Sequence, residues 1–278
     1  MSARYLSPMR ICTETQALID AERSNPLSLI SLPALEGAKI DEGVSSERFG
    51  LTSRGDRVPL MIWQPRDQPK APLVVFQYGL GGCVDHAHLE TVRQLVGCGL
   101  SVATVDWTLH GARFSPKLSE RLVQAATRNK DHPNDMGLVR QFMGQSALDL
   151  SRALDGVEKE TAIPTDRVAL LGLGWSGALM TLLATVDPRP ATLLLAGAPR
   201  PAPERFLDVP QLLTQIRPSS VQWLTSDLST SEAASWKEAL QSACPGSFSC
   251  QQATDGVEPL SATARDKACA FLRSELLS

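Results

Sequence analysis

The sequence lacks an excess of positive charge and any long apolar run. Its 27 lysines and arginines are outnumbered by 30 aspartates and glutamates, which leaves a net charge of -3. A protein that binds nucleic acid or an anionic membrane usually carries a basic surface, so we expect neither partner. Residues 1–16 contain no apolar run of signal-peptide length, and the apolar runs elsewhere are strand-sized. These absences predict a cytoplasmic protein.

The cysteines lack the close spacing of a metal site or a redox motif. They lie at positions 12, 83, 98, 244, 250 and 269, and no two of them form a Cys-x-x-Cys pair. Such spacing is typical of free thiols in a reducing compartment, with a Cys244–Cys250 disulfide as the alternative. Asp85, His86 and His88 do not have the spacing of zinc ligands. We therefore expect no metal and no cofactor.

After residue 44 the hydrophobic pattern alternates between strand-length and helix-length segments. Residues 47–52 and 58–64 flank a Ser-Arg-Gly-Asp turn and predict a β-hairpin. A hairpin followed by six strand–helix units predicts an α/β fold with a mostly parallel, doubly wound sheet. The other predicted strands are 73–77, 101–106, 168–171, 192–196, 221–224 and 248–252, and the predicted helices are 14–23, 86–97, 133–157, 176–185, 205–215, 231–242 and 261–277.

The length of the chain suits one large domain. Its 278 residues are 43% hydrophobic, enough for a sizeable core. We assign residues 1–44 to an N-terminal arm and residues 45–278 to the α/β domain. Residues 111–132 are polar and irregular, which predicts a short lid or a loop. Nothing in the pattern fixes the oligomeric state, and a homodimer is compatible with it.

Two strand-to-helix junctions attract attention, because ligands of doubly wound sheets bind beyond the carboxyl ends of strands. The first is Tyr78-Gly79-Leu80-Gly81-Gly82, where glycines let backbone N–H groups approach a ligand. A tight turn explains glycines here but not their number, and no phosphate-loop pattern follows. The second runs from Asp106 to Arg113 and contains His110 and Gly111.

These junctions resemble those of the α/β-hydrolase superfamily, and the resemblance covers roughly residues 47–278. Gly79-x-Gly81-Gly82 resembles the His-Gly-x-Gly-Gly stretch that supplies half of the oxyanion hole, with Tyr78 in the place of the histidine. The second junction resembles the Asp-x-x-x-His-Gly-x-Arg segment of dienelactone-hydrolase-like esterases. There the histidine, here His110, orders loops beside the site. The resemblance implies the α/β-hydrolase fold.

A third junction, after residue 171, resembles the nucleophile elbow Gly-x-Ser-x-Gly of that superfamily. Counted from the strand that starts at Val168, the place of the nucleophile is Gly174, which has no side chain. In a second register Ser176 would be the nucleophile. That register needs a strand two residues longer or a local bulge.

The rest of the catalytic triad is also incomplete in this resemblance. The superfamily order is serine, then a carboxylate, then histidine. The four histidines, at 86, 88, 110 and 132, all precede the elbow, and Gly256-Val257 stands where a Gly-His pair is expected. Asp227 follows the strand that often carries the carboxylate, although a turn or helix-cap role explains it as well. Glu258 lies beside the missing histidine.

These departures predict a protein that does not carry out Ser-His-Asp hydrolysis. Our first hypothesis is a cofactor-independent, non-hydrolytic enzyme of lyase, isomerase or epimerase, or cyclase type. It would act on a small apolar carbonyl compound, for example in natural-product biosynthesis, and use a retained oxyanion-type pocket. The alternatives are a non-catalytic, ligand-binding pseudoenzyme and an esterase that uses Ser176 in a shifted elbow. The candidate acid, base or orienting groups are Tyr78, His110, Asp227 and Glu258, and the candidate pocket residues are Gly79, Leu80, Gly81, Gly174, Trp175 and Ser176.

Overall fold

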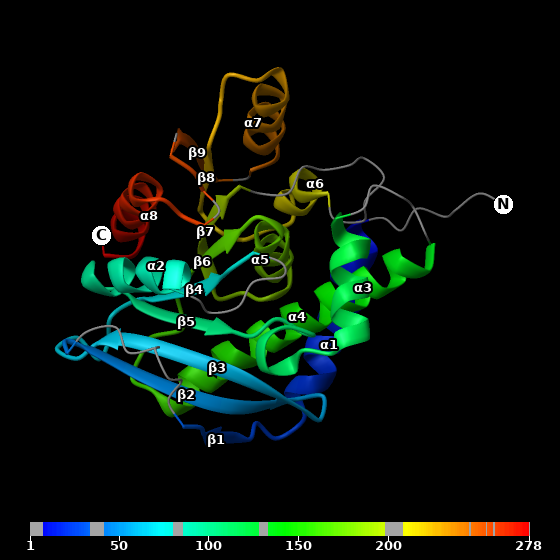
Figure 1. The fold of residues 1–278 in the computed structure, drawn as a ribbon, viewed down its shortest axis with the longest axis vertical. Helices are drawn as coiled ribbons and strands as arrows, with labels where there is room; N and C mark the ends of the chain where they lie inside the picture. Colours follow the sequence, from blue (N-terminus) through cyan, green and yellow to red (C-terminus); the bar gives the residue numbers. More distant parts are fainter. Residues whose placement is uncertain are drawn as a thin grey trace.

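A nine-stranded β-sheet with helices on both faces forms the centre of the molecule (Figure 1). The computed structural model describes residues 8–33, 42–79, 86–127, 133–197, 208–244, 246–253, 255–257 and 259–277. The strands are β1 (Leu29–Ser31), β2 (Val44–Ser53), β3 (Asp56–Pro65), β4 (Leu73–Gln77), β5 (Ser101–Val105), β6 (Val168–Leu173), β7 (Pro190–Ala196), β8 (Ser220–Thr225) and β9 (Ser247–Gln252). The helices are α1 (Pro8–Arg23), α2 (His86–Gly97), η1 (Gly111–Arg113), α3 (Pro116–Thr127), α4 (Pro133–Glu160), α5 (Trp175–Val186), α6 (Val209–Leu213), α7 (Ser231–Ala243) and α8 (Ala262–Leu276).

The sheet has the strand order β1-β2-β3-β5-β4-β6-β7-β8-β9. The first three strands and β5 pair antiparallel, and the pairs from β5–β4 through β8–β9 are all parallel. Every residue of β4, β5 and β6 is buried, which is why these strands are mostly apolar. The predicted hairpin and the mostly parallel, doubly wound sheet are confirmed.

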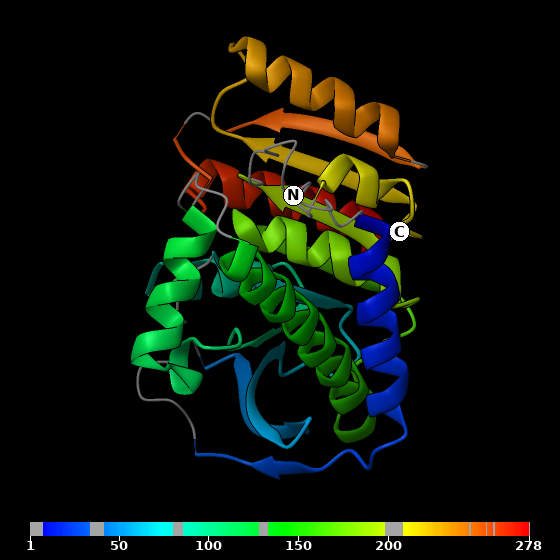
Figure 2. The same ribbon diagram turned by 90° about the vertical axis from the view of Figure 1, so that its right-hand side faces the viewer.

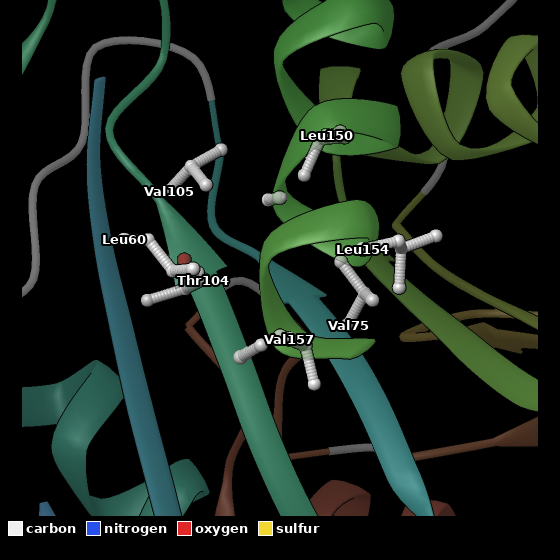
Figure 3. Close-up of a pocket in the computed structure, with 9 residues that line it drawn as sticks. Leu60, Val75, Thr104, Val105, Leu150, Leu154 and Val157 are labelled. Atoms are coloured by element: carbon white, nitrogen blue, oxygen red, sulfur yellow. The ribbon is translucent and has the colours of Figure 1, made fainter. Parts of the chain in front are cut away.

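Helices α2 and α8 cover one face of the sheet, and α1, α4 and α5 cover the other (Figures 1 and 2). The long helix α4 packs against β2 and β5 and lies beside α1 (Figure 2). Figure 3 shows how its apolar side chains meet β3, β4 and β5, leaving a cavity of only about 10 Å³, which is roughly the space of one water molecule. The lining side chains labelled there are Leu60, Val75, Thr104, Val105, Leu150, Leu154 and Val157.

The N-terminal segment is more integrated than an arm. Helix α1 begins at Pro8, earlier than the predicted residue 14, and buries Ile11 and Ile19 against the domain. The three residues of β1, which we did not predict, extend the sheet beside β2. Arg23, at the end of α1, reaches the buried carboxylate of Asp187 at 3.2 Å. The described part of residues 1–44 therefore packs as part of the α/β domain.

Residues 111–132, for which we predicted a short lid or a loop, are mostly helical in their described part. Residues 111–113 form η1, and 116–127 form helix α3, which starts at Pro116, a favourable first helical residue. Only a narrow apolar stripe anchors α3, with Leu122 fully buried and Leu118 exposed. The polar composition therefore hid its helical period. In the described ranges, no helix is both long and apolar enough to cross a membrane.

Candidate functional site

The turn between β6 and α5 consists of Gly174 alone. Its backbone has φ 52° and ψ -121°, a conformation that residues with a side chain rarely adopt. The Gly174 N–H donates to the carbonyl of Ala196 at 2.8 Å, and the Gly174 carbonyl accepts from Gly177 N–H at 2.9 Å. Gly174 thus lies at the carboxyl edge of the sheet, between β6 and β7, in front of the first turn of α5.

Gly172 explains how the helix can follow the strand so closely. A Cβ at Gly172 would lie 2.5 Å from the carbonyl oxygen of Ser176 and 2.7 Å from the nitrogen of Gly177. Only glycine permits this approach of strand and helix backbones. The sharp turn between β6 and α5 therefore favours glycine at both position 172 and position 174.

Ser176 lies inside the protein. Its side chain is fully buried, and its hydroxyl donates a hydrogen bond to the backbone carbonyl of Tyr78. The same carbonyl accepts a hydrogen bond from the indole Nε1 of Trp107 at 2.9 Å. The Ser176 hydroxyl therefore joins α5 to the end of β4 and to the segment after β5.

The Tyr78 side chain is also engaged within the fold. It is fully buried, and its hydroxyl lies 3.0 Å from Oδ1 of Asp106. The other oxygen of Asp106 accepts the backbone N–H of Ala112 at 3.0 Å. Gly111 has φ 52°, and a Cβ there would lie 2.5 Å from the Asp106 carboxylate. Tyr78 thus holds the Asp106 carboxylate by a hydrogen bond, and Gly111 leaves room for that carboxylate in the tight turn.

His110 is a buried histidine that holds the same turn. It is 4% exposed, and its Nδ1 lies 3.0 Å from the carbonyl of Thr108. Its ring packs beside Trp107 and Phe142, at centroid distances of 6.2 Å and 5.9 Å. Burial lowers the pKa of His110, while the hydrogen bond to Thr108 and the charge of Asp106 act in the opposite direction. The imidazole is therefore mainly neutral near neutral pH.

A buried ion pair that we did not predict supports this region. The Arg113 guanidinium lies 2.6 Å from Oδ2 of Asp149, whose side chain is 1% exposed. The Asp149 carboxylate also accepts hydrogen bonds from Ser53 at 2.6 Å and Thr108 at 3.2 Å. Asp149 lies on α4, far along the chain from its partners, so no local motif marks it.

A cleft of about 440 Å³ opens beyond the carboxyl ends of β7, β8 and β9. We call it the carboxyl-edge cleft. The Asp227 carboxylate lies here, exposed, and accepts the backbone N–H of Ser229 at 2.7 Å. The hydrogen bonds from Ser229 lower the pKa of Asp227, so it is ionised at neutral pH. The lining residues are Gly197, Trp223, Thr225, Ser226, Asp227, Thr230, Glu232, Ala233, Trp236, Gly256 and Val257.

The structure separates the predicted site residues into two groups. Asp227 lines the carboxyl-edge cleft, whereas Tyr78, His110 and Ser176 do not. Gly79 is buried just after β4. Leu80, Gly81 and Glu258 lie outside the described residues, as do Asp85 and the side chain of His86. Gly174 is hydrogen-bonded to Ala196 at the end of β7, and neither Gly174 nor Trp175 lines the cleft.

The sequence reasoning missed most residues of the cleft, among them Trp223, Glu232 and Trp236. They come from β8 and α7, and only their packing side by side brings them together. Cys244 and Cys250, for which a disulfide was the alternative, are free thiols. Among the described residues, no group of three or more histidine, cysteine, aspartate or glutamate side chains could hold a metal ion.

Comparison with known proteins shows similarity at the level of the fold. No protein-family model matches the chain, and no curated protein sequence does. The structure is similar to an acetyl xylan esterase from Paenibacillus sp. R4, with a TM-score of 0.69, 14% identity, and coverage of 96% of this chain and 94% of that one. It is also similar to acetyl xylan esterase 1 from Thermoanaerobacterium sp. JW/SL YS485, with a TM-score of 0.65, 15% identity and coverage of 99% and 96%.

A third similar structure is a putative dienelactone hydrolase from Klebsiella pneumoniae, with a TM-score of 0.60 and 14% identity over 84% of this chain and 99% of that one. Structural similarity at such low sequence identity establishes the fold and leaves the chemistry open. The chain has the α/β-hydrolase fold, as its junction segments predict.

Proposed function

We propose that this α/β-hydrolase-fold protein binds a small-molecule ligand at the carboxyl edge of its sheet without hydrolysing esters. The observation that carries the proposal is Gly174, the one residue of the turn between β6 and α5. In this fold the nucleophile stands on that turn. A glycine offers no oxygen to attack a carbonyl carbon, so no acyl-enzyme can form there.

The surroundings of the other candidate groups support the same proposal. Val257 occupies the segment after β9 where the fold places its histidine. One ring nitrogen of His110 is engaged with the carbonyl of Thr108. Without an imidazole to orient, the Asp227 carboxylate acts as a turn residue, bonded to the Ser229 N–H. No histidine is therefore among the described residues that line the cleft.

The environment of Ser176 argues against the shifted register. A nucleophilic serine must present its hydroxyl to substrate and pass its proton to a base. The Ser176 hydroxyl is fully buried and donates a hydrogen bond to the carbonyl of Tyr78, which is not a base. Attack on a substrate would require breaking this contact and moving α5.

A non-hydrolytic enzyme is the second candidate, and the first turn of α5 favours it. Helix α5 begins directly after Gly174, so the positive end of its dipole lies at this turn. Backbone N–H groups at such a position can stabilise an oxyanion or an enolate. Such an enzyme also needs an acid or a base. Tyr78 and His110 are hydrogen-bonded within the fold, and the lowered pKa of Asp227 makes it a weak base at neutral pH. Binding without turnover therefore has the better support.

The test combines an ester assay with active-site labelling. We expect short p-nitrophenyl esters to be hydrolysed no faster with the protein than in buffer, and a fluorophosphonate probe to leave the protein unmodified. The Ser176→Ala variant serves as the matched control and should behave identically. Hydrolysis or labelling that disappears in Ser176→Ala would overturn the proposal and establish an esterase.

A further inference from the structure

Helices α2 and α8 pack against each other on one face of the sheet (Figure 1). The side-chain amide of Gln94, on α2, joins the two helices. Its nitrogen donates a hydrogen bond to Oδ1 of Asp266 on α8, and its oxygen accepts one from Nε of Arg265 at 3.0 Å. These two contacts determine which residues of α8 face which residues of α2.

Two cysteines meet one helical turn beyond these contacts. Cys98 follows Gln94 by four residues, and Cys269 follows Arg265 by four residues. Residues four apart lie on the same face of a helix, so both cysteines lie at the contact between α2 and α8. There the Cys269 thiol hydrogen-bonds to the sulfur of Cys98. The register of the two helices therefore places one thiol against the other.

The end of α2 holds the backbone of Cys98 in place. The Cys98 N–H donates to the carbonyl of Gln94 at 3.0 Å, so Cys98 continues the last turn of the helix. Gly99 follows with φ 83°, and its N–H donates to the carbonyl of Val96 at 2.9 Å. A glycine in the left-handed conformation commonly ends a helix. The position of the Cys98 sulfur is thus determined by a helix end and not by a loop.

The two thiols differ in their access to solvent. Cys98 is half-buried, whereas Cys269 is only 4% exposed. Burial raises the pKa of the Cys269 thiol, and the neighbouring Cys98 thiol and Asp266 raise it further. Thiols react with oxidants as thiolates, and exposed thiols react before buried ones. We therefore expect an oxidant to reach Cys98 first and Cys269 to react second.

Other cysteines of the described chain have partners of a different kind. Cys12 accepts a hydrogen bond from the hydroxyl of Thr185 at 3.4 Å, and Cys244 donates one to a backbone carbonyl at 3.7 Å. An oxygen partner cannot form a disulfide with either sulfur. At the contact between α2 and α8, in contrast, two sulfur atoms are already neighbours, which is the first requirement of a disulfide.

We propose that Cys98 and Cys269 form a reversible disulfide when the protein meets hydrogen peroxide, and that this bond locks α8 to α2. In the first step the Cys98 sulfur attacks a peroxide oxygen, the O–O bond breaks, and the thiol proton leaves with the second oxygen as water. The product is a sulfenic acid on Cys98. The Cys269 sulfur then attacks the Cys98 sulfur, the S–S bond forms, the S–O bond breaks, and a second water leaves.

The two thiols together lose two electrons and two protons, and one peroxide is reduced to two waters. The second step joins groups that are already in contact, which favours it over attack by another peroxide from solution. The disulfide cross-links positions 98 and 269 and so restricts the unfolded chain. The oxidised protein should therefore unfold at a temperature about 5 °C or more above that of the reduced protein. None of this depends on what the carboxyl-edge cleft binds.

Peptide mapping tests the site directly. The folded protein is reduced, freed of reductant, treated with a molar excess of hydrogen peroxide, blocked with iodoacetamide in denaturant and digested with trypsin. Trypsin places Cys98 in the peptide 94–113 and Cys269 in the peptide 268–273, and neither peptide contains another cysteine. We expect mass spectrometry to find these two peptides joined, with the loss of two hydrogen atoms. Dithiothreitol added before digestion should separate them.

Three variants locate the effect. Cys98→Ser changes the half-buried thiol, and Cys269→Ala replaces the buried thiol by an apolar group, so at least the first should fold normally. Both should lose the joined peptides and the rise in unfolding temperature. Cys12→Ser is the matched control, because Cys12 is also half-buried and a serine oxygen can still accept from Thr185. It should form the cross-link to the same extent as the unmodified protein.

Four results would contradict the inference. The first is peroxide oxidation that leaves the two peptides unjoined, and the second is a cross-link that forms only in denaturant. The third is equal cross-linking of other cysteine pairs. The fourth is a cross-linked protein that unfolds at the same temperature as the reduced one, which would mean that the disulfide distorts the contact between α2 and α8.

Discussion

Gly174 and Gly137 differ in backbone conformation. This difference determines how a substitution by alanine at each position changes the stability of the protein. Gly174 has φ 52°, where a Cβ is strained, whereas Gly137 lies in α4 with nothing within 4 Å of the place of a Cβ. We expect Gly174→Ala to lower the free energy of unfolding by about 1–3 kcal/mol and Gly137→Ala to raise it by about 0.5–1 kcal/mol. Urea denaturation at an unchanged m-value measures both. A Gly174→Ala variant as stable as the parent would contradict the strained turn.

His110 should make stability depend on pH just below neutrality. Burial holds its pKa in the folded state below the ordinary value of 6.5, so the unfolded chain binds a proton at higher pH than the folded protein does. Stability is then present at high pH and is lost as pH falls through about 6.5. His110→Gln should flatten this loss in urea midpoints recorded between about pH 5 and about pH 8. The same slope in both proteins would exclude His110 as its source.

At the scale of residues, the sequence predicts features that depend on one short segment of the chain. The spacing of Gly172 and Gly174 places the turn between β6 and α5, because both glycines belong to one short segment. It does not reveal that Tyr78 and Ser176 are engaged with each other, because their contact joins residues 98 positions apart. A sequence pattern identifies polar residues at strand ends, but their hydrogen-bond partners come from the tertiary fold.

At the scale of elements, α4 is tied to the sheet through one carboxylate. Asp149 joins Ser53 at the end of β2, Thr108 after β5 and Arg113 in η1. Its removal would take the nearest carboxylate from a buried guanidinium and an acceptor from two hydroxyls. The guanidinium would keep longer contacts to Asp56 at 3.6 Å and to the Asp106 carbonyl at 3.4 Å. The junction therefore fixes how α4 lies across the sheet.

We expect Asp149→Ala to lower the free energy of unfolding by about 3–5 kcal/mol, the range for breaking a buried ion pair. Glu160→Ala is the control, because Glu160 lies at the exposed end of the same helix and its change should stay within about 0.5 kcal/mol. Thermal and urea unfolding of both variants test this. Equal effects would mean that helix propensity, and not the buried junction, determines the result.

The elements that sequence reasoning predicted share a clear hydrophobic period. The strands at 73–77 and 101–106 are recovered as β4 and β5 because they are short, mostly apolar runs that are buried on both faces. The strand β1 was missed because three half-buried or exposed residues carry no period. Helix α3 was missed because its single buried leucine lies among polar residues.

At the scale of the whole molecule, Asp187 connects the N-terminal helix to the domain. Its carboxylate lies 2.6 Å from Arg189 and 3.2 Å from Arg23, and it accepts the Ser151 hydroxyl at 2.7 Å. Burial by itself raises the pKa of Asp187, but the hydrogen bonds and charge of Arg189 and the Ser151 hydroxyl outweigh it, so the net shift is downward.

This network predicts an acid limit for the fold. Because the pKa of Asp187 is lower in the folded state than its ordinary value of 3.8, its contribution to stability is present above that value and is lost as pH falls through the lower, folded pKa. Asp187→Asn should therefore be much less stable than the parent at neutral pH and approach it in strong acid. Unfolding midpoints of both proteins against pH measure the convergence. A difference that is constant with pH would contradict an ionised Asp187.

The class of the fold was predictable, whereas the carboxyl-edge cleft was not. The alternation of strands and helices predicts a mostly parallel, doubly wound sheet. The order of its strands comes from the structure. The cleft is built where segments after three different strands meet the start of α7, so the pairing of its two tryptophans depends on side-chain packing. The sequence indicated only that Asp227 stands at this edge.

The carbonyl of Tyr78 restricts how the three segments around it can move. By accepting both the Trp107 indole and the Ser176 hydroxyl, it connects three segments that are distant in the chain. None of them can separate alone without exposing a buried polar group. The indole proton of Trp107 should therefore be among the slowest to exchange with deuterated solvent, at the rate of complete unfolding, and it provides a natural reporter of that event.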